Sequence, residues 1–141
     1  MFNQILIPVD LVHQEHVAEL REAARLLIDG SGNITLLYVD PTRVHGDSLV
    51  VQLDESDDAE PRREALTQLQ GLAQSLQLEN VTMNVITREG AAHDQILEYA
   101  AEISADAILM MASRPGLTDY FIGSTAERVV RHADCSVFVI R

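Results

Sequence analysis

The sequence predicts an α/β fold: one parallel sheet of five strands with helices packed on both of its faces. Short apolar runs, typical of buried strands, alternate with stretches in which apolar residues recur every three or four positions. The resulting order is β-α-β-α-β-α-β-α-β, so a helix occupies every connection between strands, as parallel pairing requires. No internal repeat, low-complexity tract or linker divides the 141 residues, and we expect residues 1–141 to form one domain.

Five segments carry the strand pattern. Ile5-Leu6-Ile7-Pro8-Val9 is nearly continuous in apolar residues, as expected of a strand that is buried on both faces. Residues 81–85 instead alternate apolar with polar side chains, which indicates a half-exposed strand at a sheet edge. The chain ends in an apolar strand that we also place at an edge. The expected strands are residues 5–9, 34–39, 81–85, 107–112 and 136–140.

Four helices are expected between these strands. We expect the first to end at Gly30-Ser31-Gly32-Asn33, and the second to begin at Asp57-Asp58, before Pro61 and after a long acidic loop at residues 41–59. The third follows Gly90-Ala91-Ala92, and the fourth begins at Gly123-Ser124. Their inward residues are expected to be Val17, Leu20, Ala24, Leu27 and Ile28; then Leu66, Leu69, Ala73 and Leu76; then Ile96, Leu97, Ala100 and Ile103; and last Ala126, Val129 and Val130.

The charge balance excludes several classes of function. Twenty-two acidic residues face ten basic ones, for a formal charge of −12, and such a surface repels the phosphate backbone of nucleic acids. All ten basic residues are arginines, so the chain cannot supply the lysine of a P-loop.

No apolar run approaches the ~20 residues that cross a bilayer, and the N-terminus lacks the basic region of a secretory signal. We therefore expect a cytoplasmic protein without membrane insertion, whose single cysteine, Cys135, forms no internal disulfide.

The ends of the strands are the places to look for a ligand, because open parallel sheets bind ligands beyond the carboxyl ends of their strands. The first strand ends in Pro8-Val9-Asp10, where Asp10 would accept hydrogen bonds from a ribose hydroxyl or a base edge, or else cap the next turn. The second strand ends in Tyr38-Val39-Asp40. Its backbone amides and carbonyls could form hydrogen bonds with an adenine edge, or these residues could simply pack at the end of the strand.

The segment after the fourth strand suits a phosphate group. Ser113 and Arg114 leave that strand, and an arginine can hold two phosphate oxygens at once. Gly123-Ser124-Thr125 opens the last helix, and a helix N-terminus binds anions through its free amides and its dipole. The alternative is an ordinary loop with a Ser/Thr helix cap.

Over its whole length the sequence resembles the universal stress protein family, and especially the F-type branch of that family. The resemblance is carried by Pro8-Val9-Asp10, by Leu36-Leu37-Tyr38-Val39-Asp40, by Gly90-Ala91-Ala92 and most specifically by residues 123–141, which begin Gly-Ser-Thr-Ala-Glu-Arg. Two departures stand in the family's Gly-x-x-Gly loop: Ala112 replaces its first glycine, and Ser113-Arg114-Pro115 replaces the segment around its second.

The resemblance implies a Rossmann-like sheet in the order 3-2-1-4-5 and an ATP-binding stress-response regulator with at most slow hydrolysis. ATP, with or without Mg²⁺, would place its phosphates on Ser113, Arg114, Gly123, Ser124 and Thr125. Its adenosine would lie among Pro8, Asp10, Val39 and Met111, and Val9 and Ala112 would also contact the nucleotide. The resemblance also implies a homodimer formed through residues 136–140 and a regulatory protein partner that the sequence does not name.

Two other functions stay open at this stage. Loss of the loop glycines is also compatible with a nucleotide-free dimeric interaction protein, and the fold with a small hydrolase, although no catalytic residues can be assigned from spacing. His13 and His16 lie three residues apart near the first helix, where exposed polar side chains explain them more simply than a metal site does, and we assign no metal ligand.

Overall fold

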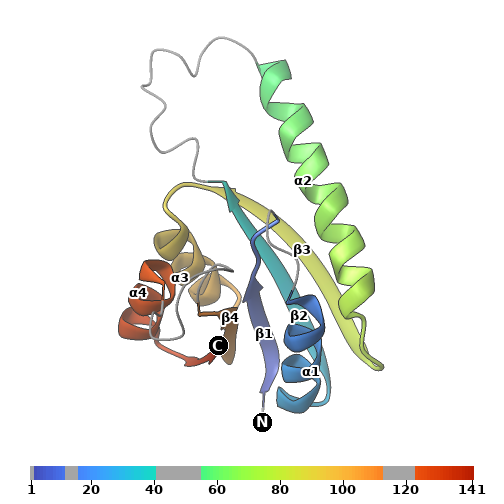
Figure 1. Cartoon of the computed structure of the whole chain (residues 1–141), viewed down its shortest axis with the longest axis vertical. Coiled ribbons are helices and arrows are strands. Elements are labelled where there is room, and N and C mark those ends of the chain that lie inside the picture. The colour runs from blue at the N-terminus through green and yellow to red at the C-terminus, as the bar shows by residue number, and fades with distance from the viewer. Residues whose placement is uncertain (1, 12–15, 41–54, 113–122) are drawn as a thin grey trace.

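A computed structural model of the chain describes residues 2–11, 16–40, 55–112 and 123–141 (Figure 1). Strands and helices alternate along this chain, as the sequence predicts. In order they are β1 (Phe2–Pro8), α1 (Val17–Leu27), β2 (Ile28–Asp40), α2 (Glu55–Leu76), β3 (Val81–Glu89), α3 (Ala92–Glu102), β4 (Ala107–Met111), α4 (Ser124–His132) and β5 (Ser136–Ile140).

The five strands form one parallel sheet in the order β3-β2-β1-β4-β5, which confirms the predicted fold class and strand order. β1 lies at the centre of the sheet, and its residues Ile5, Leu6 and Ile7 are all fully buried. β3 and β5 are the two edges. Since all strands run the same way, their carboxyl ends meet along one edge of the sheet, at Pro8, Asp40, Glu89, Met111 and Ile140. We call this the carboxyl edge.

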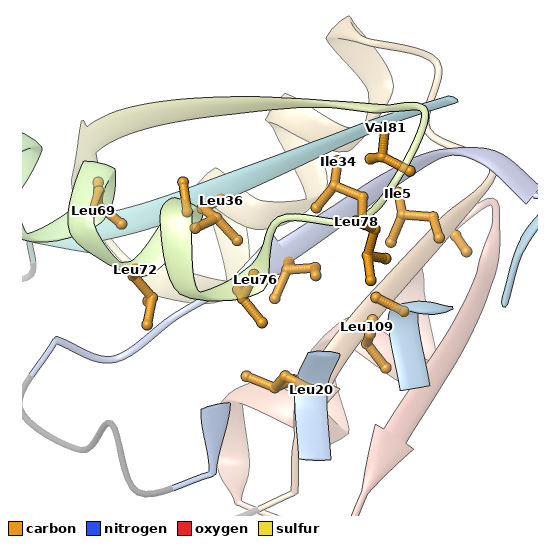
Figure 2. Close-up of a cluster of buried hydrophobic side chains, with 14 residues drawn as sticks. Ile5, Leu20, Ile34, Leu36, Leu69, Leu72, Leu76, Leu78, Val81 and Leu109 are labelled. Atoms are coloured by element: carbon orange, nitrogen blue, oxygen red, sulfur yellow. The ribbon is translucent and has the colours of Figure 1, made fainter. Parts of the chain in front are cut away.

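Alternate side chains of the central strands pack into two separate cores, one on each face of the sheet. Ile5 and Ile7 pack with the apolar residues of α1 and α2, whereas Leu6 packs with those of α3 and α4. Figure 1 shows α3 and α4 together on one side of the sheet and α1 and α2 on the other. Figure 2 shows how Leu69, Leu72 and Leu76 of α2 lie over Ile34 and Leu36 of β2. Each fully buried side chain of this size contributes roughly 1.5–3 kcal/mol to folding.

The predicted end of the first helix is wrong by a few residues. α1 ends at Leu27, and Ile28 already has extended backbone (φ −68°, ψ 136°) and begins β2. Gly30-Ser31-Gly32-Asn33 therefore belongs to the strand and does not form a turn that ends the helix. The strand pairing explains these glycines: two steps along β1, from Phe2 to Gln4, correspond to five steps along β2, from Ile28 to Asn33. The glycines let the surplus backbone of β2 bulge beside β1.

Three smaller expectations also need correction. α2 begins at Glu55, inside the predicted loop, and Pro61 lies within the helix and not at its start. Leu66 is only half-buried, and the inner face of α2 is formed by Ala65, Leu69, Leu72, Ala73 and Leu76. Val130, expected to face inward, is 51% exposed, because it lies about 100° around the helix from Val129, the residue that faces the core.

Asp106 joins the first strand to the fourth at the opposite, amino-terminal edge of the sheet. Its carboxylate oxygen Oδ2 accepts the backbone N–H groups of Asn3 (2.8 Å) and Gln4 (2.9 Å), and its own N–H donates to the Gln4 carbonyl at 2.8 Å. We expect Asp106→Ala to lower the free energy of unfolding by about 1–3 kcal/mol, because two strand amides lose a charged acceptor. Urea unfolding measures this change. Asp134→Ala is the matched control: Asp134 is also exposed and has no hydrogen bond within the described part of the chain, so an equal loss in both variants would contradict the assignment.

Candidate functional site

The order of strands changes direction between β1 and β4, and the sheet opens there. From β1 the chain moves outward to β2 and β3 on one side, and later to β4 and β5 on the other. The ladder between β1 and β4 ends at Leu6↔Ile108, whereas β1 stays paired with β2 as far as Pro8↔Leu37. The last residues of β1 and β4 are thus not joined to each other, which is the arrangement in which parallel sheets bind ligands. We call this place the switch point.

Pro8, Val9 and Asp10 leave β1 at the switch point, where the sequence places them. Val9 is held by a 2.9 Å bond from its N–H to the Leu37 carbonyl, and its side chain packs against the core beneath α1 and α2. Asp10 lies one residue beyond and is exposed. The strand end therefore fixes the backbone next to Asp10 and presents its carboxylate at the carboxyl edge.

The end of β2 lies beside it and brings Val39 to the same edge. Val39 is half-buried against the core beneath α3 and α4. The next residue, Asp40, accepts the Gly90 N–H through its backbone carbonyl at 3.1 Å. This bond holds the start of α3 against the end of β2, so the Gly90-Ala91-Ala92 turn also belongs to the carboxyl edge.

Tyr38 is a neighbour of the site that the sequence does not single out. Burial raises the pKa of its phenol, and the nearby carboxylates of Asp40 and then Asp10 raise it further. Both carboxylates, one just beyond the end of β1 and one at the end of β2, therefore act on the same phenol. The two carboxylates also concentrate negative charge at this part of the carboxyl edge. Such a site favours hydroxyl and amine donors over phosphate.

The raised pKa of Tyr38 predicts a loss of stability in alkali. The folded state holds the phenolic proton more tightly than the unfolded chain does, so the stabilisation is present below the ordinary Tyr pKa of about 10 and is lost as pH rises through the folded value. We expect the free energy of unfolding in urea to fall more steeply between about pH 9 and 11 for the unsubstituted protein than for Tyr38→Phe. Equal slopes would contradict the raised pKa of Tyr38.

On the other side of the switch point, a short chain of backbone bonds holds the start of α4 against β4. The Ala112 N–H donates to the Ile140 carbonyl (2.8 Å), and the Ala112 carbonyl accepts the Gly123 N–H (2.5 Å). Ala112 is buried, and Met111 before it is half-buried. Gly123 is the N-cap residue of α4 and has no side chain to cap the helix, so among the described residues no side chain caps the first amides of α4, on Ser124 and Thr125.

The structure thus brings most of the predicted site together at the carboxyl edge. Pro8, Val9 and Asp10 from β1, Val39 from β2, and Met111 and Ala112 from β4 all lie at strand ends, with Gly123, Ser124 and Thr125 at the start of α4. Ser113 and Arg114 lie outside the described residues. Among the residues that are described, no three His, Cys, Asp or Glu side chains are grouped so that they could hold a metal ion.

A groove of about 600 Å³ between α3 and α4 was not predicted. It begins at Ser124 and continues past the charged and imidazole side chains of His93, Asp94, Arg128, Arg131 and His132. A more open hollow of about 760 Å³ lies at the opposite edge of the sheet, beside Gly30, Ser31 and Asn80, far from the strand ends that form the switch point. We regard the groove as the relevant cavity because it is continuous with the start of α4. No described helix is both long and apolar enough to span a membrane.

Comparison with known proteins finds sequence relatives over the whole chain and solved structures with the same fold. Universal stress protein G of Salmonella typhimurium (strain LT2) is 29% identical over 145 residues, which cover all of both chains. The solved structure of universal stress protein UspA from Lactobacillus plantarum superimposes with a TM-score of 0.68 at 24% identity, over 99% of this chain and 98% of that one. The structure of the universal stress protein from Archaeoglobus fulgidus in complex with dAMP gives a TM-score of 0.67 at 21% identity, over 99% and 98%.

The match to a family model is equally complete. The model of the universal stress protein family matches residues 1–141. Together with the sheet order and the whole-length relative, this match agrees with the resemblance carried by the strand ends and by residues 123–141. The chain therefore belongs to the universal stress protein family.

Proposed function

We propose that this chain binds ATP at the switch point and acts as a stress-response regulator in the cytoplasm. The observation that carries the proposal is the pair of bonds Gly123 N–H to Ala112 carbonyl and Ala112 N–H to Ile140 carbonyl. They hold the uncapped start of α4 beside the place where β1 and β4 separate. A ligand there can meet the helix amides and the ends of β1 and β2 at the same time, which is what a molecule with an anionic end and a hydrogen-bonding end requires.

In this proposal each part of the site has one task. The amides and hydroxyls of Gly123, Ser124 and Thr125 bind phosphate, together with Ser113 and Arg114. Asp10 accepts a ribose hydroxyl, and Pro8, Val9, Val39, Met111 and Ala112 surround the adenosine. The relative from Archaeoglobus fulgidus, solved with dAMP, supports an adenine nucleotide as the ligand class. Mg²⁺ would bind through the nucleotide's phosphates, where it neutralises charge and orients them.

Hydrolysis is proposed to be slow at most. The site residues hold the nucleotide through amides, hydroxyls and packing, and we assign none of them as a general base. Nucleotide occupancy would then act as a signal to a regulatory protein partner and not as a step of turnover. A rate well below the ~1–10³ s⁻¹ of ordinary enzymes is the expected result.

We also propose a homodimer formed through β5. β5 is an edge strand, and Val137, Phe138, Val139 and Ile140 are half-buried in the single chain. Phe138 packs edge-to-face on Phe2, with ring centroids 5.2 Å apart. Pairing with the same strand of a second copy would cover these apolar residues and the unpaired edge by two-fold symmetry. Light scattering coupled to size exclusion measures the mass in solution, and a monomer across the micromolar range would contradict this part of the proposal.

Mass spectrometry of small molecules released from the purified protein, followed by calorimetric titration with ATP, tests the ligand. We expect a released adenine nucleotide, and binding of ATP that weakens in Asp10→Asn while binding of inorganic phosphate is unchanged. GTP serves as the control for the base. If millimolar ATP with Mg²⁺ neither binds nor raises the melting temperature, the proposal is wrong, and a nucleotide-free interaction protein of the same fold becomes the better assignment.

A further inference from the structure

The groove between α3 and α4 collects basic groups on a protein that is otherwise strongly acidic. The chain carries a formal charge of −12, yet two of its ten arginines and two of its five histidines line this one groove. Arg128, Arg131 and His132 come from α4, and His93 comes from the first turn of α3. Guanidinium and imidazole groups from two helices thus face one space of about 600 Å³.

The two carboxylates of the groove already have partners. Glu127 pairs with Arg131, one turn along α4, at 2.8 Å. Asp94 lies 3.2 Å from Nε2 of His93, its neighbour in sequence. Because each carboxylate is engaged by a basic group, neither needs the second arginine of the groove.

Arg128 is that second arginine, and it contacts a histidine. Its Nη1 lies 3.5 Å from Nδ1 of His93, so the guanidinium faces an imidazole and not a carboxylate. Nε2 of the same ring faces Asp94, which favours the tautomer whose Nδ1 is an acceptor. A guanidinium carries five N–H donors, and one ring nitrogen uses at most one of them. Within the described residues the donors of Arg128 are therefore largely open to a ligand in the groove.

Arg128 also lies in line with the start of its helix. Ser124 borders the same groove, and Arg128 is one helical turn farther along, about 6 Å by the rise of an α-helix. An anion bound at the first amides of α4 would have Arg128 as its next basic neighbour along the groove. A single phosphate would meet one of these two places, and a chain of phosphates would meet both.

We propose that this groove binds the outer phosphates of an oligophosphate chain, with Arg128 as the principal ligand and His93 holding its guanidinium in place. The chain belongs either to a nucleoside triphosphate held at the switch point, in which case this inference rests on the proposed function, or to a free oligophosphate. For the nucleotide, the groove makes the protein prefer ATP to AMP, because only the longer phosphate chain reaches Arg128.

Calorimetric titration of the full chain with AMP, ADP, ATP and inorganic tripolyphosphate tests this proposal in three proteins: the unsubstituted chain, Arg128→Gln and Arg25→Gln. Arg25 is the matched control, since it loses the same charge from an exposed site on α1, where it pairs with Glu22 on the opposite face of the sheet. Circular dichroism melting confirms that all three are folded. We expect Arg128→Gln to weaken ATP and tripolyphosphate about tenfold, with AMP unchanged and Arg25→Gln without effect.

The outcomes separate the two proposals. If Arg128→Gln binds ATP and tripolyphosphate as tightly as the unsubstituted chain does, the groove site is wrong, and the binding of ATP still supports the proposed function at the switch point. If no nucleotide binds but tripolyphosphate binds and depends on Arg128, the groove site is supported with a free oligophosphate as its ligand, and the proposed function is wrong. If nothing binds, both are overturned.

Discussion

Gly32→Ala is expected to destabilise this fold by about 3 kcal/mol, an upper-range cost for an overpacked site. A Cβ atom added at Gly32 would lie 2.4 Å from the carbonyl oxygen of Asn3 and 3.0 Å from its carbonyl carbon. Both are backbone atoms of β1, the central strand, so no flexible side chain can move aside to make room. Gly32 also lies where five residues of β2 pass two of β1, and a shift of the backbone there would disturb the pairing from Gln4↔Asn33 onward.

Urea unfolding of Gly32→Ala against Gly71→Ala measures this cost with a control from the same chain. Gly71 lies inside α2, five residues before its end, and a Cβ atom there would meet nothing within 4 Å. Alanine is the better helix former by about 0.5–1 kcal/mol, so Gly71→Ala should raise the free energy of unfolding. The two substitutions add the same methyl group with opposite expected signs. A Gly32→Ala protein as stable as the unsubstituted one would contradict the close approach of β1 and β2.

The fold could be predicted because buried strands and the inner faces of helices each have a characteristic spacing of apolar residues. The run Ile5-Leu6-Ile7 predicts a strand covered on both faces, and a helix between every two strands predicts parallel pairing. Gly30-Ser31-Gly32-Asn33 misled because glycine ends helices and also permits close contact between strands. The sequence shows the glycine but not the Asn3 carbonyl beside it, and that contact is what identifies its role.

The candidate site could be predicted only in part, for a related reason. Asp10 and Val39 can be placed at the edge from the sequence because strand ends in a parallel sheet meet there whatever the side chains are, whereas Met111 is a candidate only through the family resemblance. The groove was missed because its two sides are far apart in sequence: His93 opposes Arg128, 35 positions later. The stripe Ser124, Arg128, Arg131 on α4 can be read at helical spacing, but no local pattern places the first turn of α3 against it.

Ser124→Pro is expected to weaken ATP binding by about 10- to 100-fold while leaving the fold intact, which is the loss of one charge-assisted hydrogen bond of about 1.5–3 kcal/mol. Ser124 is the first residue of α4, and within the described chain its N–H has no backbone acceptor. Proline is well tolerated at this position because the missing N–H is one that the helix does not use. The preceding residue, Gly123, has φ −57° and ψ 156°, which is the extended backbone that proline requires before it.

Ser124→Ala separates the amide from the hydroxyl, since it removes only the Oγ atom and keeps the N–H. If the helix amides carry phosphate binding, Ser124→Ala should lose much less affinity than Ser124→Pro, and both should melt near the temperature of the unsubstituted protein. Equal losses in the two variants would assign the phosphate contact to the hydroxyl. Unchanged affinity in Ser124→Pro would move the phosphates away from the start of α4. The comparison therefore tests whether a chain without lysine binds phosphate through the backbone amide that follows the Gly123 N-cap of α4.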